Sequence, residues 1–227
     1  MRREMTYALR RTLPVACGYL FLGTAFGILL SQVGYGPAWA FASSLLVYAG
    51  SMQFVMVALL AAGAPLYTVA VTTLLVNARH IFYGLGFIER FRSMGRRFAY
   101  MAFSLTDETY SVLCSMEAPE GLRWEDCAFW VALFDHAYWV IGSVLGAVAG
   151  QAIPVDMTGI DFSMTALFVV IFVDQWKQFP SHIPALTGLA CAVAARLLFG
   201  PDNFLLIALV AAVAILALLR ARLEESV

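Results

Sequence analysis

A run of 67 residues, from Thr12 to Ala78, contains no charged side chain. A membrane-spanning helix needs about 20 mostly apolar residues, so this run is long enough for two or three spans. Turn-forming clusters at Gly34–Pro37 and Ala62–Pro65 divide it into segments. The run predicts a chain that folds within a lipid bilayer.

The composition of the whole chain agrees with a membrane protein. Of its 227 residues, 62% are hydrophobic and 13% are charged, and a soluble chain of this size could not cover its surface with so few charges. This excludes a typical soluble enzyme, a nucleic-acid binder, a disordered chain and a disulfide-rich secreted domain. The four cysteines have no CxxC spacing, and no nucleophile–base or metal-ligand pattern occurs, so we expect neither an enzyme nor a metal or other cofactor.

Hydrophobicity divides the chain into eight segments, and we expect an all-α integral membrane protein, a polytopic helical bundle forming one transporter domain over 1–227. The segments are 13–33, 38–62, 65–88, 98–116, 127–150, 161–178, 181–200 and 203–220. A polar, acidic loop at 117–126 separates the fourth from the fifth. Arginines at positions 2, 3, 10 and 11 precede the first segment, which is longer than a signal-peptide core, so we expect an uncleaved span with its N-terminus in the cytoplasm.

The distribution of arginine conflicts with eight simple crossings. If every segment crossed the membrane, the third would place Arg90, Arg92, Arg96 and Arg97 outside, against the preference of basic residues for the cytoplasmic side. A re-entrant third segment, broken at Asn77–His80, removes the conflict, because irregular backbone is tolerated where it lines a cavity. With the seventh segment also re-entrant, six crossings remain and both termini are cytoplasmic.

Short patterns recur along the chain and favour an internal repeat. Gly23 and Gly27 are followed by Gln32, and Gly142 and Gly146 by Gln151, at an offset of 119 residues. With the crossings above, halves 12–116 and 127–222 would be inverted with respect to each other, as in many secondary transporters. The alternative is a set of simple helices with chance similarity, in which the glycines serve only close helix packing.

Ionisable groups inside membrane spans are costly and usually functional. The candidates are Arg79, His80, Asp107, Glu108, Asp135, His136, Asp174 and Arg196, together with the amides Gln53, Asn77 and Gln175.

Two readings stay open for most of these groups. Arg79 can hold a substrate carboxylate with paired hydrogen bonds, or form an ion pair with Asp107, Glu108 or Asp174. The adjacent acids Asp107 and Glu108 can couple transport to protons or only balance Arg79. Asp135 beside His136 is a second candidate proton site, whereas a structural role is favoured for Arg196.

Four blocks of the sequence resemble the AzlC family of bacterial branched-chain amino-acid permeases. They are Gly23–Gly27, Tyr48–Phe54, Leu74–His80 and Leu105–Tyr110, and the AGSxQF and NxRH patterns within them are the most specific. One departure is Ala78, where the family usually has a leucine-like residue. The similarity covers nearly the whole chain.

The resemblance implies a secondary transporter that exports valine, leucine, isoleucine or similar hydrophobic amino acids across the bacterial inner membrane. It also implies a small AzlD-like four-helix membrane subunit as partner. An amino-acid substrate needs anchors for its carboxylate and ammonium groups. We therefore expect Gln53, Asn77, Arg79, His80 and Gln175 to bind substrate, and Asp107, Glu108, Asp135 and Asp174 to be the candidates for proton coupling.

Two other functions stay open at this stage. A channel for small zwitterions would need a continuous polar path in place of an occluded site. A membrane scaffold for the small subunit would need no transport at all.

Overall fold

The computed structural model describes residues 2–152, 181–200 and 204–224, together with 169, 172–173 and 176–177. Of residues 79, 81, 82, 205, 206, 209 and 220–224 it describes only the backbone. The described part of the chain is helical, without strands. It divides into two compact units, residues 1–63 with 76–157 and residues 64–75 with 158–227. Asp174 and Gln175 lie outside the described residues, as does most of the predicted segment 161–178.

Two long helices form the axis of the first unit: α1 (Arg2–Gln32) and α7 (Trp124–Ala152). Both are long and apolar enough to cross a membrane by length and composition, and among the described residues only these two meet that test. The count of eight spanning segments is therefore not confirmed. Shorter apolar helices include Gly50–Ala61 and Ile183–Phe199.

The two glycine pairs bring α1 and α7 into backbone contact. A methyl group built on Gly23 would lie 3.0 Å from the backbone nitrogen of Ser143, and one on Gly142 would lie 2.9 Å from the carbonyl oxygen of Leu20. Farther along, Gly146 meets the backbone of Thr24. The packing role predicted for these glycines is confirmed, because no side chain larger than hydrogen fits at this separation.

These contacts also fix the relative direction of α1 and α7. Leu20 lies beside Gly142 and Thr24 beside Gly146, so the two helices run parallel. In halves that begin with these helices and are inverted, they would run in opposite directions. The inversion expected from the recurring glycine pattern is therefore wrong for this pair of helices. The repeat boundaries 12–116 and 127–222 stay a prediction.

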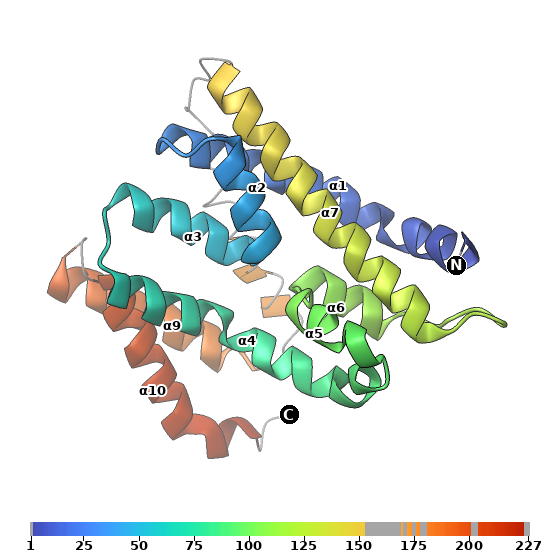
Figure 1. The fold of residues 1–227 in the computed structure, drawn as a ribbon. Helices are drawn as coiled ribbons and strands as arrows, with labels where there is room; N and C mark the ends of the chain where they lie inside the picture. Colours follow the sequence, from blue (N-terminus) through green and yellow to red (C-terminus); the bar gives the residue numbers. More distant parts are fainter. Residues whose placement is uncertain are drawn as a thin grey trace. The chain divides into compact units, whose positions relative to one another are not determined.

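The second and fourth hydrophobic segments are not single helices. Segment 38–62 forms α2 (Pro37–Leu46) and α3 (Gly50–Ala61). Segment 98–116 forms α5 (Phe98–Phe103), preceded by the short helix η1 (Gly95–Arg97), and α6 (Asp107–Cys114). Each pair is a helical hairpin with its tip inside the unit (Figure 1).

The α5/α6 hairpin enters from the starting end of the unit, where α1 and α7 begin. Arg97, just before α5, pairs with Asp126 near the start of α7 at 2.6 Å. The tip, Ser104–Thr106, reaches Tyr19 in the middle of α1. α6 then returns, and Arg11 of α1 donates to the carbonyl oxygen of Ser115 just after it, at 2.6 Å.

The α2/α3 hairpin enters from the far end of the unit, where α1 and α7 end. Gly36, before α2, lies against Gln151 near the end of α7. The tip reaches the middle of α7, where Gly50 lies against the Trp139 ring, and α3 turns back toward the far end (Figure 1).

This arrangement corrects the predicted topology. The helix α4 (Leu66–Arg92) is continuous through Asn77–His80, so the re-entrant break expected there is wrong. Its last turns, Phe87 and Phe91, belong to the core at the starting end. The segments that turn back are the second and the fourth, not the third. The conflict over the arginines at 90–97 disappears because they share an end of the unit with the N-terminus.

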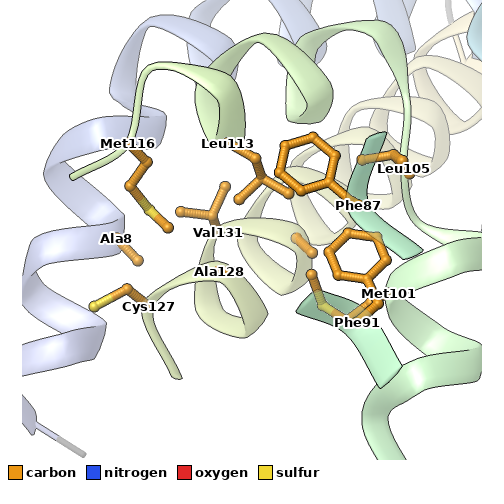
Figure 2. Close-up of a cluster of buried hydrophobic side chains, with 11 residues drawn as sticks. Ala8, Phe87, Phe91, Met101, Leu105, Leu113, Met116, Cys127, Ala128 and Val131 are labelled. Atoms are coloured by element: carbon orange, nitrogen blue, oxygen red, sulfur yellow. The ribbon is translucent and has the colours of Figure 1, made fainter. Parts of the chain in front are cut away.

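An apolar core closes the starting end of the unit. It is built from α1, α4, α5, α6 and α7, and its buried members include Ala8, Phe91, Met101, Leu113 and Val131. Figure 2 shows these side chains directed toward one another from the five helices. The core anchors the base of the α5/α6 hairpin and so sets the position of its tip.

The second unit contains α9 (Ile183–Phe199) and α10 (Phe204–Glu224), which pack against each other. Gly200, with φ of 77°, ends α9. The guanidinium of Arg196 lies 5.6 Å from the centre of the Phe204 ring, in line with the structural role favoured for it. The re-entrant path expected for the seventh segment, 181–200, stays a prediction.

Candidate functional site

The tips of the two hairpins meet against the paired helices α1 and α7. Tyr48, in the α2/α3 tip, lies 6.2 Å from Phe103, beside the α5/α6 tip, and its ring stacks on His136 of α7 at 4.1 Å. Tyr48 adopts a φ of 43°, the left-handed region that a residue with a side chain rarely enters. Such strain persists only where the surroundings hold it, and it concentrates at functional sites.

His136 joins the two hairpins through both ring nitrogens. Its Nε2 lies 3.1 Å from the carbonyl oxygen of Ser44 in α2, and its Nδ1 lies 3.2 Å from the hydroxyl of Tyr100 in α5. The Ser44 carbonyl is near the end of α2, where backbone oxygens lose their helical partners. The imidazole of His136 therefore provides a hydrogen-bond partner for a carbonyl oxygen that lacks one where α2 ends.

Gln53 holds the α2/α3 tip to α7. Its side chain is fully buried, and its Oε1 accepts from the indole nitrogen of Trp139 at 2.8 Å and from the backbone nitrogen of Ala49 at 3.2 Å. Its Nε2 donates to the hydroxyl of Ser44 at 3.2 Å. The bonds that the structure describes for Gln53 thus join parts of the tip to one another and to α7, and binding of substrate by this residue stays a prediction.

Asp135 is a fully buried carboxyl group on α7. Its Oδ2 accepts from the hydroxyl of Thr109 in α6 at 2.8 Å. Its Oδ1 is buried and has no hydrogen-bond partner within the described part of the chain. Because buried acceptors are nearly always satisfied, an open carboxylate oxygen at the meeting point of two helix breaks is a candidate contact for a ligand or a proton.

The adjacent acids of α6 have different surroundings. Glu108 is exposed, and its Oε2 accepts from the hydroxyl of Tyr19 at 2.6 Å, whereas Asp107 is half-buried. The same Tyr19 hydroxyl lies 2.6 Å from that of Thr106, which caps α6 by accepting from the backbone nitrogen of Thr109. Thr106 thus starts α6 and also joins it to α1.

The polar residues at 77–80 of α4 lie apart from these hydrogen bonds, and α4 contacts α6 there through aromatic rings. Asn77 is half-buried and its Oδ1 has no hydrogen-bond partner among the described residues. The His80 ring meets the edge of Tyr83 at 5.8 Å, and Tyr83 stacks on Tyr110 of α6 at 4.5 Å. The Arg79 side chain is not described, so its carboxylate-binding and ion-pair readings both stay predictions.

Four residues of this site were not identified from the sequence: Tyr19, Tyr48, Thr106 and Thr109. The blocks that carry the family resemblance contain three of them without assigning them a role. A usable signal was the threonine before two acids in an apolar segment, which is a pattern of helix N-termini. The role of Tyr19 has no comparable local signal.

No group of three or more His, Cys, Asp or Glu residues in the described part of the chain could hold a metal ion.

Comparison with known proteins gives a consistent result. Residues 14–153 match the family described as AzlC protein. The chain is 42% identical over 217 residues to an uncharacterized membrane protein of Helicobacter pylori, covering 96% of this chain and 95% of the relative. It is 37% identical to the branched-chain amino acid transport protein AzlC of Bacillus subtilis, covering 95% of this chain and 85% of the relative.

A more distant relative is the inner membrane protein YgaZ of Escherichia coli. It is 31% identical over 191 residues, which cover 80% of this chain and 78% of the relative. No solved structure matches the chain.

Proposed function

Because the chain belongs to the AzlC family, we propose that it is a secondary transporter that exports branched-chain or similar hydrophobic amino acids across the bacterial inner membrane. The observation that carries the proposal is the meeting of two helix breaks beside the buried Asp135–His136 pair, where Oδ1 of Asp135 has no partner among the described residues. Broken helices that meet inside a bundle are where transporters bind substrate and coupling ions.

The meeting point of the hairpins offers groups for both charges of an amino acid. Ala49, the N-cap residue of α3, makes no side-chain hydrogen bond to the first turn, and helix N-termini attract anions, so we assign the substrate carboxylate to this end of α3. The proposed substrate site adds Asn77, Arg79, His80 and Gln175 to Gln53, and a carboxylate such as Asp135 would receive the ammonium group.

Export against a gradient requires coupling, and we assign it to protons. The candidate carriers are Asp135, Glu108, Asp107 and Asp174. Asp135 ranks first because it is fully buried and accepts a hydrogen bond from Thr109, near the α5/α6 tip, while Glu108 ranks second because it is exposed in the first turn of α6. As the hairpin tips shift, the site that holds substrate and proton would open alternately to the two sides of the membrane.

A small AzlD-like membrane subunit is the proposed partner. The exposed apolar residues of α1 and α7, such as Leu13, Phe21 and Leu145, provide surface for either lipid or such a subunit. Transport should therefore be measured with and without it.

The test is counterflow of labelled valine in proteoliposomes that contain the purified protein. We expect saturable counterflow, since a carrier exchanges substrate across alternating states. Arg79→Ala should lower it by tenfold or more if Arg79 holds the carboxylate. Arg97→Ala, which removes an exposed arginine far from the tips, is the matched control and should retain it.

Other outcomes separate the alternative functions. Valine flux that does not saturate and shows no counterflow would identify a channel. No flux of valine, other zwitterions or organic acids by folded protein, with the small subunit present, would refute transport and leave a membrane scaffold.

A further inference from the structure

An unbroken series of hydrogen-bonding oxygens joins the exposed Glu108 to the buried Asp135. Glu108 Oε2 lies 2.6 Å from the Tyr19 hydroxyl, which lies 2.6 Å from the Thr106 hydroxyl. Thr106 Oγ1 lies 3.2 Å from Thr109 Oγ1, and Thr109 Oγ1 lies 2.8 Å from Asp135 Oδ2. The series contains two carboxyl groups and, between them, three hydroxyls.

The number of protons in this series is informative. Four oxygen–oxygen contacts need four protons, but the three hydroxyls supply only three, because each carries a single proton. With both carboxyls ionised, one contact therefore has no proton. One added proton completes the series, and it can reside on Glu108 or on Asp135.

The two completed arrangements differ only in direction. With the proton on Glu108, each hydroxyl donates toward Asp135; with the proton on Asp135, each donates toward Glu108. We propose that Tyr19, Thr106 and Thr109 form a proton relay between Glu108 and Asp135. This inference rests on the proton-coupled transport proposed above and names the path by which the buried carboxyl group exchanges its proton.

The transfer is balanced at each atom. Glu108 gives its proton to the Tyr19 oxygen, while Tyr19 gives its own to Thr106, Thr106 to Thr109, and Thr109 to Asp135. Four O–H bonds break and four form, and the net result is one proton moved from Glu108 to Asp135. No oxidant, metal or cofactor takes part.

The relay spans three helices, which makes it sensitive to movement of the hairpin. Tyr19 is held on α1 by edge contacts with Trp139 and Tyr48, at 5.3 and 6.5 Å between ring centres. Thr106 and Thr109 belong to the α5/α6 hairpin, and Asp135 belongs to α7. A shift of the tip would open the contact between Tyr19 and Thr106, so the path would conduct only in conformations like this one.

Other titratable groups surround the path without belonging to it. Asp107 precedes Glu108 on α6, and His136 follows Asp135 on α7, where its nitrogens are engaged by Ser44 and Tyr100. The Tyr48 ring lies between Tyr19 and His136. The first turn of α6 and the stack of aromatic rings therefore set the electrostatic surroundings of both carboxyls.

The first experiment follows protonation of Asp135 without any substrate. Purified protein is brought rapidly to acidic pH, and the carboxylic C=O stretch is recorded by time-resolved infrared spectroscopy, with Asp135→Asn identifying the band. Tyr19→Phe and Thr109→Val should slow its appearance by about a hundredfold, since each removes one proton carrier.

Two variants serve as matched controls. Tyr138→Phe removes a tyrosine hydroxyl of α7 that contacts Thr12, outside the relay, and should leave the rate unchanged. Thr109→Ser keeps the hydroxyl and should recover most of the rate lost in Thr109→Val. A wild-type rate in Tyr19→Phe, or no Asp135-dependent band in the wild type, would overturn the relay.

The second experiment separates failure of the relay from failure of the proposed function. In proteoliposomes, pH-driven valine transport is compared with valine exchange at equal pH. Tyr19→Phe should lower the ratio of driven transport to exchange by tenfold or more. An unchanged ratio would reject the relay alone, while a wild type that transports no valine would reject the proposed substrate and leave the infrared result to decide on the relay.

Discussion

Replacing Gly27 by alanine should separate α1 from α7. A methyl group at this position would lie 2.5 Å from the backbone nitrogen of Ala147 and would also overlap the carbonyl oxygen of Ser143. Non-bonded heavy atoms prefer about 3.5–4.0 Å. Because the obstructing atoms belong to helix backbone, no side chain can rotate away and the helices themselves must move by about 1 Å.

The expected cost follows from two opposing effects. Overpacking of a well-fitted contact costs about 1–3 kcal/mol, and a gap of 0.5–1 Å along the rest of the pair loses about a quarter to a half of each remaining contact. Alanine recovers about 1 kcal/mol through its higher helix propensity. We therefore expect Gly27→Ala to destabilise the protein by about 2 kcal/mol.

Thermal unfolding of the purified protein in detergent tests this expectation. For a chain of this length, 1 kcal/mol corresponds to about 2–4 °C in Tm, so Gly27→Ala should unfold about 4–8 °C below the wild type. Gly18→Ala on the same helix is the control, because a methyl group there meets no atom within 4 Å, and it should be neutral or slightly stabilising. Equal Tm values for the two variants would refute the parallel backbone contact between α1 and α7.

Three further outcomes are expected. Gln53→Leu should lower stability by about 1–3 kcal/mol by leaving the buried indole N–H of Trp139 without its acceptor; unfolding in detergent at wild-type Tm would contradict this. In a protein without native cysteines, Ala62→Cys should react with an impermeant thiol reagent from the periplasmic side, because α3 returns about 18 Å toward the far end; labelling only from the cytoplasm would restore the crossing expected from the sequence. Arg97→Ala should cost less than about 1 kcal/mol, since its ion pair with Asp126 is solvent-accessible, and a loss of several kcal/mol would show that this pair anchors the hairpin.

Several features were predictable from the sequence because they depend on local properties. The length and apolarity of 13–33 and 127–150 predict helices that can cross a bilayer, and the structure has α1 and α7 there. The small residues at Gly23 and Gly142 predict close packing, which is observed. Asp135 and Glu108 were identified because charge is rare in apolar segments.

The hairpin tips were not predictable, because an apolar segment of about 25 residues has the same length and hydrophobicity whether it crosses the membrane or turns back within it. A turn inside the bundle leaves backbone groups without helical partners, and side chains that the folded bundle places beside the turn must replace them. For the α2/α3 tip, the replacements are His136 and Gln53. The break was instead expected at Asn77–His80, where polar residues occur but α4 continues.

The sequence by itself determined that this chain lies in a membrane, roughly where two of its longest helices lie, and which family it resembles, since these follow from composition and from short residue patterns. Only the tertiary structure decided which segments turn back and which hydroxyls lie between Glu108 and Asp135. Tyr19 and Thr109 are 90 residues apart in the chain, and they belong to one hydrogen-bonded series only because the glycines of α1 and α7 let the helices approach closely while the α5/α6 hairpin inserts beside them.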